Sequence, residues 1–211
     1  MSTENQFNSS GFGNIDPLDH DYTKKLLQNG VPNNQTSNLI LSHDNSDLFQ
    51  DKKAYNYEKS IEVLYANYNV ASAGNFNKNA KRQNNKADIK YSDVIILCSI
   101  DGDLANKIID AVNRGTVYAI EDMMPIKLRK IVRVGGLKIE DKLKIGEETN
   151  FLKVKFTYFE QNQRTGLMYF RFEYEHMRQT IFCFDEFGVS CGVNVSETRL
   201  FDDAPGMLIG S

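Results

Sequence analysis

The chain has 211 residues, of which 41% are hydrophobic and 25% are charged, and its formal net charge is −3. This length fits one domain, or one domain with a tail, and the small net charge gives no reason to expect nucleic acid or a membrane surface as a partner. No stretch approaches the roughly 20 apolar residues of a membrane-spanning helix, and Met1–Gly13 lacks the basic start and apolar run of a signal peptide. We therefore expect a protein of the cytoplasm or of a virion.

Residues 1–52 are rich in Asn, Ser, Asp and Gly. Such a segment buries too little apolar surface to offset its chain entropy, so we expect a long irregular N-terminal arm and a single α+β domain over residues 53–211. Within the arm, Tyr22–Asn29 has the pattern of one or two helical turns that end at Gly30.

Two apolar islands interrupt the polar chain of this arm. A freely flexible terminus does not require apolar side chains, whereas an arm that lies along a neighbouring subunit requires them for contact. We therefore predict that the islands bind a partner, and a plain flexible terminus is the alternative. The residues concerned are Leu39, Ile40, Leu41, Leu48 and Phe49.

The next stretch combines an ambiguous run with a long polar loop. Ala54–Ala71 fits a helical stripe as well as a strand, and its β-branched and aromatic content favours a strand over Ser60–Val70. The loop Ser72–Lys86 follows, and it is either a solvated loop or a basic finger that contacts phosphate or an acidic protein face. Its basic residues are Lys78, Lys81, Arg82 and Lys86.

A strand–helix–strand unit is predicted over about residues 93–121. Asp93–Ile100 is a continuous apolar run, typical of a strand buried on both faces. The following segment has apolar residues on one helical face, Asp101 or Asp103 as its cap, and Gly115 as its stop. Thr116–Glu121 is then a short strand.

From about residue 126 to residue 200, short strands with turn signals predict a β-rich barrel or sandwich that packs with this unit. We interpret Asn150–Phe187 as a three-stranded antiparallel meander with turns at Gln161–Gly166 and His176–Gln179. One of its faces mixes aromatic and charged side chains and needs cover from the helix, the tail or another subunit. We predict partner contacts there by Tyr169, Arg171, Phe182 and Phe184.

Three short motifs bear on chemistry. Asp101-Gly-Asp103, placed after a strand and before a helix, resembles the D-x-D of haloacid-dehalogenase-like phosphatases, which implies a Mg²⁺ site or a nucleophilic Asp; a helix cap is the alternative. Gly188-Val-Ser190-Cys-Gly192 has the letters of a nucleophile elbow, but a strand follows where a helix is required. Arg129 and Arg133 resemble the R-x-x-x-R of PilZ domains, which bind cyclic di-GMP, although the second motif of that family is missing.

Cys and His residues at metal-ligand spacing, a phosphate loop and a coiled coil are absent from the sequence. We therefore predict no cofactor, no metal site beyond the Asp101 and Asp103 candidates, and no enzymatic activity. The favoured function is a structural or assembly subunit of a homo- or hetero-oligomeric complex of the virion, tail or secretion-apparatus type. A soluble regulatory or adaptor domain for a nucleotide or protein ligand is the alternative, followed by a metal-dependent hydrolase.

Overall fold

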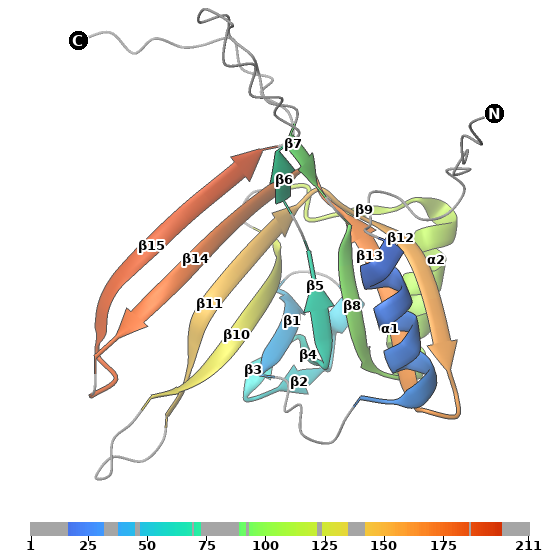
Figure 1. Cartoon of the computed structure of the whole chain (residues 1–211), viewed down its shortest axis with the longest axis horizontal. Helices are drawn as coiled ribbons and strands as arrows, with labels where there is room; N and C mark the ends of the chain where they lie inside the picture. Colours follow the sequence, from blue (N-terminus) through green and yellow to red (C-terminus); the bar gives the residue numbers. More distant parts are fainter. Residues whose placement is uncertain are drawn as a thin grey trace, which may run out of the picture.

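Two antiparallel β-sheets form the body of the protein (Figure 1). The computed structural model describes residues 17–31, 38–44, 47–68, 70–72, 89–91, 93–121, 124–134, 142–185 and 187–199. The large sheet has the strand order β15-β14-β11-β10-β1-β4, and the small sheet has the order β5-β8-β13-β12-β9.

The strands of the large sheet are β1 (Leu39–His43), β4 (Ser60–Val63), β10 (Ile126–Val134), β11 (Lys142–Leu152), β14 (His176–Phe184) and β15 (Ser190–Arg199). Those of the small sheet are β5 (Tyr65–Asn67), β8 (Val94–Ser99), β9 (Val117–Tyr118), β12 (Val154–Asn162) and β13 (Leu167–Glu173). Two short ribbons pair β2 (Lys53–Ala54) with β3 (Tyr57–Glu58) and β6 (Val70–Ser72) with β7 (Ile89–Tyr91). The helices are α1 (Pro17–Asn29), α2 (Gly102–Arg114) and the 3₁₀ turn η1 (Asp47–Phe49).

The chain passes directly from one sheet to the other at three points in the described residues. Leu64 separates β4 from β5, and Lys153 separates β11 from β12 with a φ of 50°. Tyr174 and Glu175 separate β13 from β14, and the Glu175 amide donates to the Leu152 carbonyl at 3.1 Å. Because strands that switch sheets close the corners of a stacked pair, this connectivity defines a sandwich of the predicted kind.

The core lies between the facing sheets and combines aliphatic side chains with a cluster of aromatic rings. Phe151 lies within 5.4 Å of Phe172 and 5.0 Å of Tyr174, measured between ring centroids. One face of α2 closes this core through Leu104, Ala105, Ile108 and Ala111, all of them buried. Figure 1 shows α2 beside β12, at the end of the sandwich away from β15.

The helix α2 forms where its local signals predict it. Asp101 is extended at the N-cap and accepts a hydrogen bond from the Leu104 amide at 3.0 Å, and Gly115 ends the helix with a φ of 62°. The buried strand β8 before it is also confirmed: Val94–Cys98 are all less than 3% exposed.

The described part of the N-terminal segment, residues 17–31, 38–44 and 47–52, belongs to the folded domain rather than to an irregular arm, and this corrects the predicted boundary at residue 52; residues 1–16 lie outside the described residues. β1 lies inside the large sheet, paired with β10 on one side and β4 on the other. Leu48 and Phe49 of η1 are buried in the main core. The helix predicted at Tyr22–Asn29 exists as the longer α1, which packs on the face of the small sheet opposite the core.

The predicted three-stranded meander is only partly right. β12 and β13 pair as expected, across a turn that ends at Gly166. His176–Gln179, however, is not a turn: it begins β14, which leaves the small sheet and pairs with β11 in the large sheet. Likewise, the run Ser60–Val70 contains three strands rather than one.

Candidate assembly surface

The outer end of the large sheet projects beyond the small sheet. We call this part the wing and define it as 131–134 of β10, 142–146 of β11, 180–184 of β14, 190–195 of β15 and the loop that joins β14 to β15. Figure 1 shows these strand ends extending to the left, away from β8 and β13. The small sheet therefore leaves this part of the large sheet uncovered.

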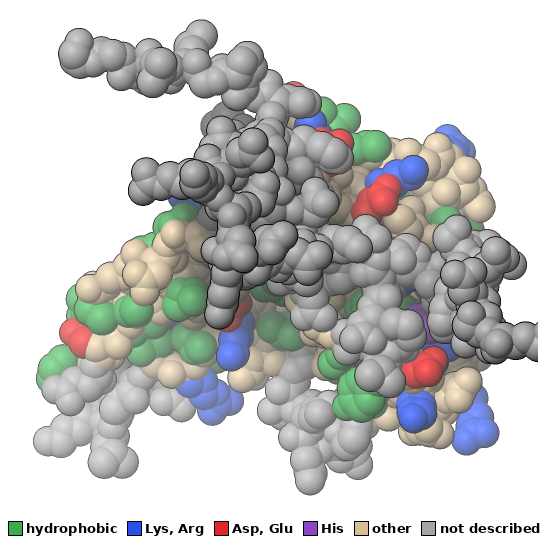
Figure 2. Space-filling model, turned by 45° about the horizontal axis from the view of Figure 1, so that its top comes forward, with side chains coloured by type: hydrophobic (Ala, Val, Ile, Leu, Met, Phe, Trp, Pro, Cys, Tyr) green, Lys and Arg blue, Asp and Glu red, His purple; other side chains and the backbone are tan. Residues whose placement is uncertain are grey.

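Large apolar side chains are exposed on the wing. Their exposed fractions are 44% for Ile181, 52% for Val193, 51% for Val195 and 39% for Leu143, and Phe187 and Val189 of the joining loop are still more exposed. Figure 2 shows hydrophobic side chains gathered at the left of the molecule, over the wing. Exposed large apolar side chains gathered in one region in this way mark a contact site for another protein.

Exposed apolar side chains lie on both faces of the wing. In the register of β14 and β15, Val195 lies opposite Thr180, and Ile181 lies opposite Asn194. Because successive side chains of a strand alternate between faces, Val195 and Ile181 point to opposite sides of the sheet. Each face of this thin sheet consequently needs its own cover.

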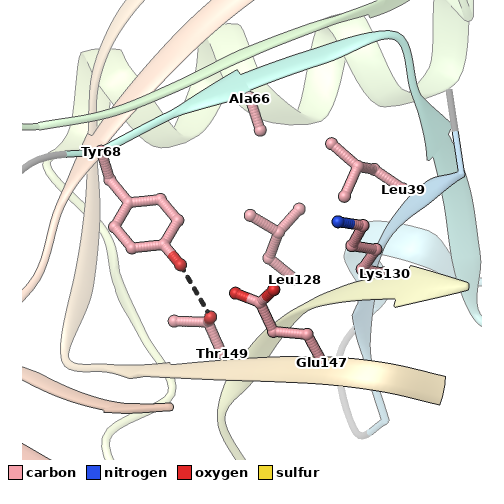
Figure 3. A pocket seen from close by; sticks show the side chains of 7 residues that line it. All are labelled: Leu39, Ala66, Tyr68, Leu128, Lys130, Glu147 and Thr149. Carbon is pink, nitrogen blue, oxygen red and sulfur yellow. Dashed lines mark hydrogen bonds between the residues drawn. The ribbon is translucent and has the colours of Figure 1, made fainter. Parts of the chain in front are cut away.

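Two hollows lie next to each other at the root of the wing. The first, of about 110 Å³, opens between the sheets beside the hydrogen bond between Tyr68 and Thr149, whose oxygens are 2.9 Å apart (Figure 3). The second, of about 400 Å³, runs along the wing past Val132, Val134 and Phe184. Both are lined by Lys130 and Glu147, so they are neighbours, and we refer to the two together as the groove.

Charged groups border this groove. Lys130 and Glu147 are direct partners across β10 and β11, and Gln179 donates to the Glu147 carboxylate at 2.6 Å. Lys144 donates to the Gly188 carbonyl, and its ammonium lies 5.1 Å from the centre of the Phe184 ring. This mixture of apolar and charged side chains is typical of a contact surface for another protein.

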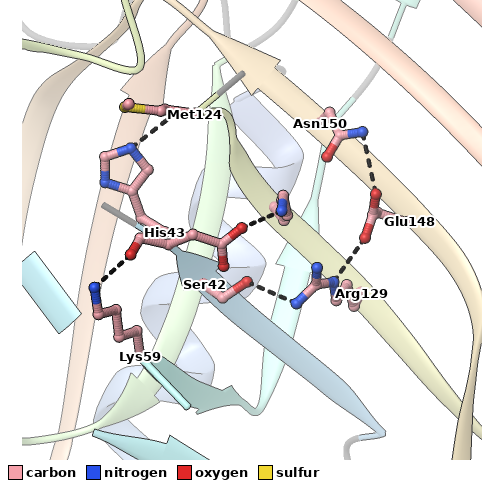
Figure 4. A network of polar contacts seen from close by, with 9 residues as sticks. Ser42, His43, Lys59, Met124, Arg129, Glu148 and Asn150 are labelled. Atoms are coloured by element: carbon pink, nitrogen blue, oxygen red, sulfur yellow. Dashed lines mark hydrogen bonds and ion pairs between the residues drawn. The ribbon is translucent and has the colours of Figure 1, made fainter. Parts of the chain in front are cut away.

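The outer face of the large sheet carries a polar network near β1 (Figure 4). Arg129 donates to Glu148 at 2.7 Å and to Ser42 at 3.2 Å, and its guanidinium lies over the Tyr57 ring at 5.7 Å. Arg129 is therefore engaged within the fold, whereas Arg133, the other member of the R-x-x-x-R pattern, is exposed on the wing. The two arginines do not form the paired phosphate clamp that the PilZ resemblance implies.

His43 belongs to the same network. Its Nε2 donates to the Met124 carbonyl at 2.9 Å, so Nδ1 is the unprotonated nitrogen when the ring is neutral. Burial lowers the pKa of His43 below its ordinary value, against the opposing effect of this hydrogen bond.

The residues predicted to bind partners fall into two groups. Ile40, Leu41, Leu48 and Phe49 are at most 2% exposed, and the same chain covers them, so they have no surface for a neighbour; this corrects their predicted role. Leu39 is half-buried at the first hollow.

The residues of the mixed face are divided between the two sheets. Tyr169 and Arg171 of β13 are also covered, by α1, so the N-terminal segment provides the cover that this part of the mixed face needs. Phe182 and Phe184 of β14, in contrast, are half-buried and line the groove on the wing. Their partner contacts remain a prediction.

The Asp101-Gly-Asp103 motif is used by the fold. One Asp101 oxygen caps α2, and the other accepts from the Lys52 ammonium at 2.5 Å. Partial burial alone would raise the pKa of Asp101, but these hydrogen bonds hold it below its ordinary value. Asp103 pairs with Lys107 on the helix surface at 2.8 Å.

Across the described ranges, no group of three or more His, Cys, Asp or Glu side chains is arranged to hold a metal ion.

Ser190 does not sit in a nucleophile elbow. Gly188 forms the turn with a φ of 74°, and Ser190 begins the strand β15 rather than a helix. The basic residues Lys78, Lys81, Arg82 and Lys86 lie outside the described residues. Neither α1 nor α2, nor any other helix in the part of the chain that the structure describes, is long and apolar enough to cross a membrane.

The architecture defines a β-rich sandwich closed by one helix, and solved structures share it. No family model and no curated protein matches the sequence. A type six secretion system protein is similar over 77% of this chain and 94% of its own, with a TM-score of 0.57 and 14% identity. Hcp1 from Salmonella typhimurium matches over 77% and 93%, with a TM-score of 0.51 and 9% identity. The secreted protein Hcp3 from Pseudomonas aeruginosa matches over 76% and 98%, with a TM-score of 0.51 and 9% identity. The chain thus has an Hcp-like fold.

Proposed function

We propose that this chain is a non-enzymatic structural subunit of a secretion-type apparatus, present in the cytoplasm before it assembles, and that its wing binds further copies of the same chain. The exposed apolar side chains on both faces of the wing carry this proposal. The likeness of the fold to a type six secretion system protein supports it.

The position of the apolar side chains favours a head-to-tail arrangement. Ile181 and Val195 point to opposite faces of one sheet, so a single neighbour cannot cover both. If one face of each copy binds the opposite face of the next, every copy gains two neighbours, and the assembly closes into a ring or continues as a filament. A stable contact of this type buries roughly 1,600 Å² in total.

The edge of the large sheet offers a second element of the same contact. β15 is ten residues long and pairs only with β14 among the described strands. Residues 190–196 read SCGVNVS and contain no charge or proline. Sheet edges of monomeric proteins are normally short or carry Lys or Pro, because unpaired backbone groups attract other strands. We propose that β15 pairs with, or packs against, a neighbouring copy.

Light scattering after size-exclusion chromatography, over a range of protein concentrations, tests the proposal. We expect the wild-type chain to form oligomers, and we expect Val193→Asp with Val195→Asp to shift it towards the monomer. Ile120→Asp is the matched control. Ile120 is 66% exposed, but it follows the small-sheet strand β9 and lies outside the wing, so the Ile120→Asp variant should still form oligomers. A wild-type chain that stays monomeric at every concentration refutes self-assembly and favours the adaptor alternative.

A further inference from the structure

Helix α1 is held on the small sheet by a contact that is part apolar and part charged. Leu26 and Leu27 pack against Leu97 and Leu167, and the Thr165 hydroxyl donates to the Leu27 carbonyl at 2.7 Å. The helix ends at Gly30, which has a φ of 85° and donates to the Leu26 carbonyl at 2.8 Å, and the next residue, Val31, still packs against the same apolar cluster. The apolar half of the contact lies towards this end of the helix.

The charged half of the contact surrounds the ring of Tyr158 on β12. The imidazole of His20 lies with its centroid 6.0 Å from that ring, the Lys24 ammonium lies 5.9 Å from its centre, and the Arg171 guanidinium lies 4.7 Å from it. His20 is 4% exposed, and its Nδ1 is 3.0 Å from the Tyr169 hydroxyl, with which it shares a hydrogen bond. Two permanent cations and one titratable ring therefore surround the same tyrosine, with His20 and Arg171 buried and Lys24 35% exposed at its edge.

Carboxylates balance the two permanent cations. Glu160 pairs with Lys24 at 3.1 Å and accepts from the Tyr158 hydroxyl, and Asp93 lies 3.9 Å from Arg171. Among the described residues, the titratable and charged groups around His20 are Asp21 and Lys24 from α1, Tyr158 and Glu160 from β12, and Tyr169 and Arg171 from β13; Asp93, just before β8, acts on Arg171.

We propose that α1 is an acid-released strap: a proton on His20 adds a third positive charge at the Tyr158 ring and loosens the helix from the small sheet. Release uncovers Tyr169, Arg171 and the apolar side chains beneath the helix, a second surface of the protein that is closed at neutral pH. This inference does not depend on the proposed assembly through the wing.

The direction of the pH effect follows from the surroundings of His20. Burial lowers its pKa below 6.5, and Lys24 and Arg171 lower it further, against the weaker influence of Asp21 and Glu160. The docked helix consequently binds fewer protons than the released helix. The contribution of His20 to docking is complete above pH 6.5 and is lost as the pH falls through that value towards the lowered pKa.

A single tryptophan makes the release measurable. The chain contains no Trp, and Tyr22 on α1 is 43% exposed with its ring 5.6 Å from that of Tyr65. In the full chain with Tyr22→Trp, we expect the acrylamide quenching constant to rise about twofold between pH 7.5 and pH 5.0, because local opening exposes the helix. Far-UV circular dichroism should show the sheets intact over the same range.

The controls separate His20 from other acid effects. In the Tyr22→Trp background, His20→Gln should abolish the rise, whereas His176→Gln, a change in β14 on the large sheet, should leave it unchanged. A flat response with His20 present, or an undiminished rise in His20→Gln, refutes the strap. An NMR titration of the wild-type histidine rings tests it without a variant: a His20 pKa at or above 6.5 refutes it as well.

Discussion

The dual use of Asp101 predicts a specific loss of stability. Asp101→Ala removes the acceptor for the Leu104 amide, which costs about 1 kcal/mol for an N-cap. It also removes the pair with Lys52, in which the two side chains are 22% and 35% exposed, so this pair adds only about 0.5 kcal/mol. The sum of about 1.5 kcal/mol corresponds to a fall of about 3–6 °C in Tm for a chain of this size.

Two further substitutions divide this loss. Asp101→Asn keeps an oxygen for the cap but loses the charge, so we expect a loss of about 0.5 kcal/mol. Asp103→Ala is the matched control, because Asp103 is 56% exposed and forms an ion pair with Lys107 one helical turn away; its loss should not exceed about 0.5 kcal/mol.

Urea and thermal unfolding, followed by circular dichroism at pH 7 with and without Mg²⁺, measure these differences. We expect Mg²⁺ to leave the Tm of the wild-type chain unchanged. Equal losses in Asp101→Ala and Asp103→Ala would refute the cap as the role of Asp101. A Mg²⁺-dependent rise in Tm that disappears in Asp101→Asn would instead establish the metal site that the D-x-D pattern suggests.

Urea unfolding also tests two packing predictions. At Gly146, a Cβ would lie 2.6 Å from Cγ1 of Val132, a stiff β-branched side chain, so Gly146→Ala should cost about 1–3 kcal/mol. Gly192→Ala, where nothing lies within 4 Å, should change stability by less than about 0.5 kcal/mol. Phe151→Ala should cost about 3–5 kcal/mol because Phe151 is fully buried. Phe187→Ala is its control at 64% exposure, and a similar loss in both would contradict the assigned core.

Local signals were sufficient for α2 and β8. The cap at Asp101, the stop at Gly115 and the apolar face of the helix all lie within one short stretch of sequence, and the structure uses each of them. The unbroken apolar run of β8 likewise requires cover on both faces, which α1 and the core supply. Such elements depend mainly on their own residues.

The errors at β1 and β14 have a different origin. The polar composition of residues 1–52 as a whole hides the short run Leu39–His43. Five residues are nevertheless enough for a strand when β4 and β10 supply hydrogen bonds on both sides. At the end of β13, the polar residues Glu173 and Glu175 suggest a turn but cannot tell a hairpin from a passage to the other sheet. Pairing partners that are distant in sequence decide both cases.

By itself, the sequence determined a β-rich fold with one capped helix and marked Phe182 and Phe184 as aromatic side chains in need of cover. Only the tertiary structure decided what covers these surfaces. Helix α1 covers Tyr169 and Arg171, whereas no segment of the described chain covers much of the wing. The reason is physical: alternation fixes which side chains share a face, but the cover of a face comes from segments that only the folded chain brings together.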